Sequence, residues 1–131
     1  MNLRNQIYKF FALLQWVLIS GIIFYLSSQS SIEFLPKEIW NFDKLVHLAA
    51  YMVYGGSTFL MLYSIFVNNI KVKYIMVLTV IIGAFFSATD EIHQSYTPGR
   101  DSDFFDFLAD FIGIVVSIIL FYYLLKKIKK K

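Results

Sequence analysis

Ionisable and hydrogen-bonding side chains interrupt the apolar stretches of this sequence at intervals of three and four residues. Such spacing places side chains along one face of a helix. Because an ionisable group within a membrane helix is costly, it normally faces other helices or a wet cavity. The three faces are Asp43, His47, Tyr51 and Gly55; Gly83, Ser87, Glu91 and Gln94; and Asp103, Asp106, Asp110, Gly113 and Ser117. Small residues at one end of these faces favour close helix packing.

The charged ends of these faces carry groups suited to acid–base chemistry and to anion recognition. Carboxyl groups near a histidine can serve as general acid and base. We therefore take His47, Glu91 and Asp106 as candidate catalytic residues. Arg100 follows a Pro98-Gly99 turn, and its planar guanidinium suits a carboxylate or a phosphate. The candidate substrate-binding residues are Asp43, Lys44, Tyr51, Gln94, Arg100 and Asp110.

The sequence dictates no cofactor. Carboxylate oxygens suit Mg²⁺ or Ca²⁺ better than Zn²⁺, so a divalent cation of this kind is compatible with the acidic residues. His47 and His93 are the only histidines, and we assign no metal ligands. The absence of cysteine excludes a thiol nucleophile, and no G-x-S-x-G or H-E-x-x-H motif is present. Whether the protein is an enzyme therefore stays open.

Structural roles could account for part of the same pattern. Asp43 could cap the N-terminus of a helix. Asp103 and Asp106 suit the positive end of a helix dipole. An ion pair between Glu91 and Arg100 would tie a loop.

Four long apolar segments must position these residues. The chain of 131 residues is 58% hydrophobic and only 16% charged, which is unlike a soluble domain. Spanning a hydrocarbon core of ~30 Å takes about 20 helical residues. We predict an all-α membrane protein, a four-transmembrane-helix bundle forming a single domain over residues 1–131. Its helices are expected at about 10–27, 44–67, 73–94 and 103–125.

The distribution of charge predicts the orientation of this bundle. All 9 acidic residues fall on one side of the expected membrane. The basic residues on the other side are Arg4, Lys9, Lys71, Lys73, Lys126, Lys127, Lys129, Lys130 and Lys131. Basic loops remain cytoplasmic, so we expect cytoplasmic N- and C-termini in a multi-pass cell-membrane protein. Asp110 then lies ~24 Å from Lys126, near the outer boundary.

Two other interpretations of the basic segments carry less weight. The first segment has the basic start of a signal peptide, but no A-x-A-like cleavage site follows, so we expect a retained helix. The pI of about 9.1 does not indicate nucleic-acid binding, because the lysines flank membrane segments. We expect them to meet anionic lipids at the cytoplasmic face of the bilayer. His93, which points away from Glu91 on a helix, is expected to face lipid head groups.

Five short motifs occur in order along most of the chain. They are Ser27-Ser28-Gln29, Asp43-Lys44-x-x-His47-x-x-x-Tyr51, Glu91-x-x-Gln94, Pro98-Gly99-Arg100 and Asp106-x-x-x-Asp110-x-x-Gly113. The sequence thereby resembles the VanZ-like family of small bacterial integral membrane proteins, named after an accessory protein associated with teicoplanin resistance. It departs from that pattern at Asp110, where the family usually has Asn. The resemblance implies a cell-envelope protein, with links to glycopeptide resistance or to lipid intermediates.

The leading hypothesis is a polar pocket at the outer face that binds or modifies a lipid headgroup or a lipid-linked envelope intermediate. The convergence of unlike polar side chains favours it, because packing alone does not need them. One alternative is a non-enzymatic transporter or flippase in which the polar residues form a gate. Another is a structural partner of a membrane assembly, with the same residues serving helix packing. The oligomeric state and the substrate are not given by the sequence.

Overall fold

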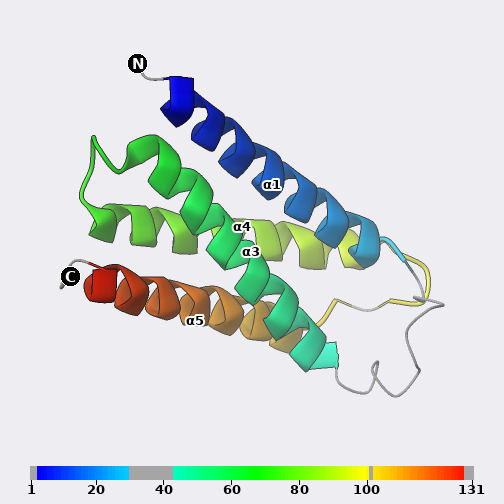
Figure 1. Cartoon of the computed structure of the whole chain (residues 1–131). Helices are drawn as coiled ribbons and strands as arrows, with labels where there is room; N and C mark the ends of the chain where they lie inside the picture. The colour runs from blue at the N-terminus through cyan, green and yellow to red at the C-terminus, as the bar shows by residue number, and fades with distance from the viewer. Residues whose placement is uncertain (1–2, 30–42, 101, 129–131) are drawn as a thin grey trace.

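The computed structural model describes residues 3–29, 43–100 and 102–128, with the side chain of Asp43 outside this description. These residues form the helices α1 (Leu3–Ser27), α3 (Asp43–Phe66), α4 (Val72–Gln94) and α5 (Phe104–Ile128), shown in Figure 1. Each of the four is long and apolar enough to cross a membrane. The predicted all-α bundle of four membrane-spanning helices is therefore confirmed. Several charged residues used to predict the orientation lie outside the described residues: Glu33, Lys37, Glu38, Asp101 and residues 129–131.

The first helix starts earlier than its apolar run. A helix was expected from about residue 10, whereas α1 begins at Leu3. The intervening residues include Arg4, Gln6 and Lys9, which are good helix formers, and no Pro or Gly interrupts them. The apolar run marks the part of a helix that fits the hydrocarbon core, and the helix itself continues past it.

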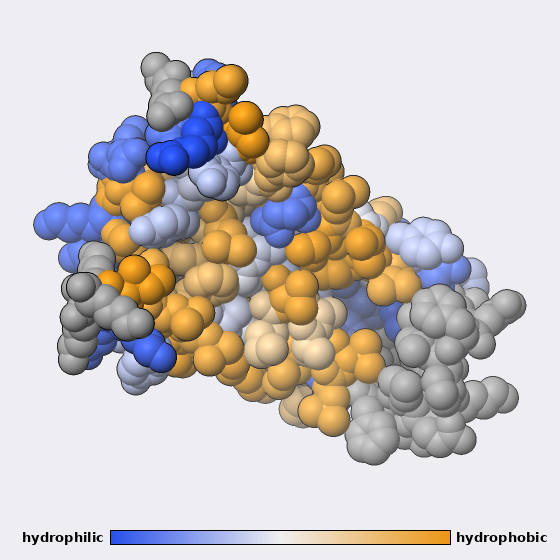
Figure 2. All heavy atoms as spheres, viewed as in Figure 1, coloured by the Kyte–Doolittle hydropathy of each residue, from blue (hydrophilic) through white to orange (hydrophobic). Residues whose placement is uncertain are grey.

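Helix ends that were predicted to lie on the same side of the membrane lie at the same end of the bundle. The start of α1, the α3–α4 connection and the end of α5 lie toward the left of Figure 1, and the opposite ends lie toward the right. Consequently the described basic residues that predict the orientation gather at the left end, and the described carboxylates gather at the right end. Figure 2 shows a largely apolar surface between these polar ends on the face in view.

Helix α3 is the centre of the bundle, because it packs against all three other helices and most extensively against α5. Glycine permits the close approach of α3 and α5. A Cβ atom on Gly113 would lie 2.4 Å from the carbonyl oxygen of Leu48, and one on Gly55 would lie 2.9 Å from the Cα atom of Ile114. The prediction that small residues in these faces serve close helix contact is confirmed.

Helix α1 packs against this core from the side and remains largely exposed to the surroundings. Its polar side chains connect it to α3. The indole Nε1–H of Trp16 donates to the hydroxyl of Thr58 at 3.0 Å, and the hydroxyl of Ser57 donates to the amide oxygen of Gln15 at 2.9 Å. Because such bonds are made between side chains within an apolar environment, they fix how far α1 is rotated and shifted along α3.

Candidate functional site

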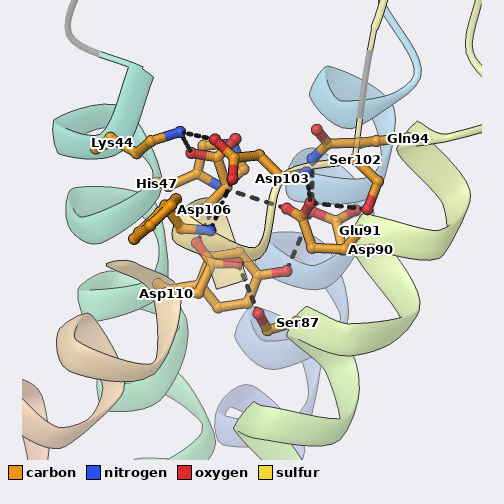
Figure 3. Close-up of polar contacts among 12 residues, drawn as sticks. Lys44, His47, Ser87, Asp90, Glu91, Gln94, Ser102, Asp103, Asp106 and Asp110 are labelled. Carbon is orange, nitrogen blue, oxygen red and sulfur yellow. Dashed lines mark hydrogen bonds and ion pairs between the residues drawn. The ribbon is translucent and has the colours of Figure 1, made fainter. Parts of the chain in front are cut away.

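Polar side chains from α3, α4 and α5 lie together at the end of the bundle that carries the α4–α5 connection, as Figure 3 shows. A tight turn leads from α4 towards α5. The backbone N–H of Arg100 donates to the carbonyl oxygen of Thr97 at 3.1 Å, and Gly99 has a φ of 80°. A positive φ at the third position, after Pro98, is typical of a type II turn. The turn expected from the sequence is therefore present, and it returns the chain to the site.

We call the side chains joined by contacts at this end the polar cluster. Its members from α3 are Lys44, His47 and Tyr51; those from α4 are Ser87, Asp90, Glu91 and Gln94; and those before and within α5 are Ser102, Asp103, Asp106 and Asp110. Most of them are buried, although they lie at the ends of apolar helices.

Lys44 joins the start of α3 to the start of α5. Its ammonium group donates short hydrogen bonds to the carboxylates of Asp103 and Asp106, as Figure 3 shows. The side chain of Lys44 is 47% exposed, whereas that of Asp106 is only 4% exposed. Lys44 therefore supplies a positive charge at the edge of the cluster to a carboxylate that lies inside it.

His47 occupies the centre of the polar cluster. Its Nδ1 atom forms a hydrogen bond of 2.9 Å with Oδ1 of Asp110, and it lies 3.9 Å from Oε1 of Glu91. The other carboxylate oxygen of Asp110 accepts a hydrogen bond of 2.6 Å from the hydroxyl of Ser87. Asp110 is completely buried, and with these two contacts both of its oxygens are bonded. The carboxylate thus fixes the orientation of the imidazole ring.

Glu91 connects the end of α4 to the segment that precedes α5. Its Oε2 atom accepts a hydrogen bond of 3.1 Å from the backbone N–H of Asp103 and one of 3.4 Å from the hydroxyl of Ser102. Its Oε1 atom is buried and has no hydrogen-bond partner among the described residues. Glu91 therefore ties the loop through the backbone of Asp103 and the hydroxyl of Ser102.

Asp90 is a member of the polar cluster that sequence reasoning did not select. Its Oδ2 atom accepts hydrogen bonds from the hydroxyl of Tyr51 at 3.1 Å and from the amide of Gln94 at 3.4 Å. Its Oδ1 atom is buried and has no partner within the described part of the chain. Asp90 precedes Gln94 by four residues, and this spacing was the signal that could have placed it on the same face.

Asp103 caps helix α5, a contact that goes beyond its expected position at the positive end of the helix dipole. Its Oδ1 atom accepts a hydrogen bond of 2.8 Å from the backbone N–H of Phe105. The hydrogen bond from Lys44, together with that from Phe105, holds the pKa of the Asp103 carboxyl below its ordinary value. The carboxylate of Asp103 is therefore charged at neutral pH and sits at the positive end of the helix dipole.

The structure brings together most of the residues that the sequence singled out. All three candidate catalytic residues lie in the polar cluster, as do four of the candidate binding residues, Lys44, Tyr51, Gln94 and Asp110. The side chain of Asp43 lies outside the described part of the structure. Arg100 stands at the last position of the turn and is partly buried.

The expectation for His93 is wrong. Instead of facing lipid head groups, His93 packs against α1. Its ring stacks on that of Phe24 with 4.3 Å between the ring centroids, and its Nε2 atom forms a hydrogen bond of 2.9 Å with the hydroxyl of Ser28. Helical spacing showed that His93 points away from the other polar residues of α4. It did not show that α1 covers the face on which His93 lies.

One group within the polar cluster has the composition of a metal site. His47, Glu91 and Asp106 each offer one ligand atom, and these three atoms lie within 4.8 Å of one another. All three residues are buried. The members come from three helices, so the group exists only when the bundle is folded.

The polar cluster holds more carboxyl groups than basic groups. Its carboxyl groups are those of Asp90, Glu91, Asp103, Asp106 and Asp110, and the one primary amine in the contacts described is that of Lys44. Ionised carboxylates only accept hydrogen bonds. A cluster of this kind can bind a metal ion or a group that carries hydrogen-bond donors.

Comparison with known proteins identifies the family of the chain. No curated protein and no solved structure matches it significantly. A family model does match, that of VanZ/LLP1, and the match extends over residues 2–126, which include all four helices almost completely. This agrees with the resemblance carried by the motifs around His47, Glu91 and Asp106. The chain belongs to the VanZ/LLP1 family.

Proposed function

We propose that this VanZ/LLP1 protein binds the head group of a lipid or of a lipid-linked envelope intermediate, and that the polar cluster is the binding site. The cluster opens to the outer face of the cell membrane in this proposal, because the basic ends of the helices remain in the cytoplasm. At that level the cluster meets the head groups of the outer leaflet.

The observation that carries the proposal is a buried acceptor without a donor. The Oδ1 atom of Asp90 is buried and has no hydrogen-bond partner among the described residues, although Tyr51 and Gln94 bond the other oxygen. A buried polar atom without a partner costs about 1–3 kcal/mol. A head group with amine or hydroxyl donors would satisfy such an atom, so the ligand expected here carries these donors beside its phosphate.

The deeper packing of the bundle supports head-group binding over transport. Below the polar cluster, the side chain of Ile114 fills the space beside Gly83, where a Cβ atom added to the glycine would meet it at 2.7 Å. A Cβ atom added to Gly55 on α3 would lie 2.9 Å from the Cα atom of Ile114. A solute crossing the membrane would have to separate these helices, whereas a head group that binds at the outer end would leave their contacts intact.

Lipid binding to the purified protein tests the proposal. The full chain in detergent is mixed with phosphatidylethanolamine, phosphatidylglycerol or a synthetic polyprenyl-phosphate-linked sugar, and bound lipid is measured by native mass spectrometry. We expect saturable binding of at least one of them, reduced about tenfold or more by Asp90→Asn or Glu91→Gln, since each loses about 1.4 kcal/mol or more of charge-assisted bonding.

Thr89→Val is the matched control. Thr89 is next to Asp90 in α4, but it is exposed and bonds the carbonyl oxygen of Phe86. Its replacement should leave lipid binding unchanged. Equal binding by the wild-type chain and both carboxylate variants would reject the proposal. A teicoplanin susceptibility assay with the same variants in cells checks whether the family's link to glycopeptides extends to this chain.

A further inference from the structure

We propose that His47, Glu91 and Asp106 form a site for one divalent transition-metal ion, Zn²⁺ or Mn²⁺. This site goes beyond head-group binding and does not depend on it. The proposal rests on the geometry of the three side chains, on one unpartnered oxygen atom, and on the contacts that hold each ligand.

The three side chains converge from different helices. His47 comes from α3, Glu91 from the end of α4 and Asp106 from the first turns of α5, and Figure 3 shows them facing one another. One ligand atom of each lies within 4.8 Å of the others. Metal–ligand bonds of about 2.0–2.2 Å place neighbouring ligand atoms about 3–3.5 Å apart. Small side-chain rotations would bring the three ligand atoms to the distances that binding of an ion requires.

A carboxylate oxygen of Glu91 supplies the independent indication of a ligand. Its Oε1 atom is buried, has no hydrogen-bond partner among the described residues and points toward His47, whose Nδ1 atom is 3.9 Å away. Glu91 as a whole is only 5% exposed, so water reaches it poorly. A buried carboxylate oxygen without a donor is stabilised when it binds a cation.

Each of the three ligands is anchored through another contact. Glu91 is held at Oε2 by the backbone N–H of Asp103, which leaves Oε1 to face the centre. Asp106 is held by Lys44. The Nδ1 atom of His47 bonds Asp110 at 2.9 Å and lies 3.9 Å from Glu91, so Asp110 positions the imidazole ring near the two carboxylates. The contacts to Glu91 and Asp106 are of the kind that orient metal ligands.

The ligand types select the metal. Oxygen atoms alone would favour Mg²⁺ or Ca²⁺, but an imidazole nitrogen beside two carboxylates favours first-row transition metals. Zn²⁺ binds three protein ligands of this kind and keeps a further position open, and Mn²⁺ accepts the same set with additional oxygen ligands. A double positive charge would also offset the excess of carboxylates in the polar cluster.

Metal titration of the full chain tests the site. The protein is purified in detergent without added lipid and treated with a chelator, which is then removed. Zn²⁺ or Mn²⁺ is added, and binding is measured by calorimetry and by metal content after gel filtration. We expect one ion per chain, with affinity reduced about tenfold or more in each of the variants His47→Gln, Glu91→Gln and Asp106→Asn.

Thr89→Val is the matched control, because Thr89 is exposed on α4 two residues from Glu91 and lies outside the polar cluster. It should bind the ion with an affinity close to that of the wild type. Circular dichroism of each variant checks that the helices remain folded. Absence of saturable binding to the folded wild-type chain would overturn the proposal. It would also be overturned by binding that Thr89→Val weakens as much as the three ligand variants do. Because no lipid is present, neither result bears on head-group binding.

Discussion

At the scale of single residues, the ammonium group of Lys44 at the surface stabilises a carboxylate in the interior of the bundle. The carboxylate of Asp106 is buried beside other acidic groups, and Lys44 is bonded to it from the edge of the bundle. Since nearly half of the Lys44 side chain is exposed to solvent, screening reduces the value of this ion pair to about 1 kcal/mol or less.

We predict that Lys44→Gln lowers the free energy of unfolding by about 1 kcal/mol, because Asp106 would lose its cationic partner. Thermal unfolding in detergent, followed by circular dichroism at neutral pH, measures the change. Lys71→Gln is the control, as Lys71 is exposed at the opposite end of the bundle. An equal effect of both substitutions would mean that Lys44 acts only through the net charge of the protein.

The same substitution should have a pH dependence of known sign. Lys44 holds the pKa of Asp103 below its ordinary value of 3.8. A depressed pKa in the folded state stabilises the protein above the ordinary pKa, and this contribution disappears as the pH falls through the depressed value. The difference in stability between the wild type and Lys44→Gln should therefore be constant near pH 7 and shrink below about pH 4. A difference that grows on acidification would contradict this role.

Residue types and spacing identified most of the polar cluster but not all its contacts. Spacing by three and four selected His47, Glu91 and Asp110, because each shares a face with the other polar residues of its own helix, whatever the neighbouring helix is. Asp90 was missed although it stands four residues before Gln94, because its neighbour Glu91 already accounted for the polar face at that level of the helix. The pairing of Lys44 with Asp106 depends on where α3 meets α5. Spacing within one helix gives no information about this contact between helices.

At the scale of the helices, the contact between α3 and α5 determines whether the polar cluster forms. These helices hold His47 and Asp110, and their backbones approach closely at Gly113, deeper in the bundle. In a membrane, where apolar side chains gain little by leaving lipid, close packing and side-chain hydrogen bonds hold helices together. The geometry of the site is therefore coupled to the glycine contact.

We predict that Gly113→Ala destabilises the bundle by about 1–3 kcal/mol, because its Cβ would lie 2.4 Å from the carbonyl oxygen of Leu48 and 2.9 Å from the backbone nitrogen of Met52. Gly21→Ala is the matched control, since a Cβ there meets nothing within 4 Å. In α1 that substitution should stabilise the helix by about 0.5–1 kcal/mol. Thermal unfolding of both variants measures the contrast, and equal values would show that α3 and α5 do not depend on this contact.

The helices also mark the limit of prediction from hydropathy. Their number followed from the length of the apolar runs, because only a helix of about 20 residues satisfies its backbone across a bilayer. The start of α1 did not follow, since Leu3 to Lys9 are helical without being strongly apolar. Nor did the contact of His93 with Phe24, because it depends on which face of α4 the first helix covers.

At the scale of the whole molecule, the two ends of the bundle have opposite character. Arg4, Lys71 and Lys126 mark an end at which no described carboxylate lies, and Asp90, Glu91 and Asp103 mark the other. The even number of helices returns the chain to the end at which it starts, as Figure 1 shows. Which end faces the cytoplasm is a prediction from the positive charges, and the head-group proposal depends on it.

Cysteine labelling tests this orientation, because the natural chain contains no cysteine and each introduced one is a unique label site. Ser95 is exposed just after α4 at the acidic end, and Asn69 is exposed in the α3–α4 connection at the basic end. In intact cells, a maleimide that cannot cross the membrane should label Ser95→Cys and leave Asn69→Cys unlabelled. After the cells are opened, both variants should react, which controls for exposure of the thiol. Labelling of Asn69→Cys alone in intact cells would show that the orientation is the opposite of the predicted one. The polar cluster would then lie at the cytoplasmic face, and its ligand would be expected among the lipids of the inner leaflet.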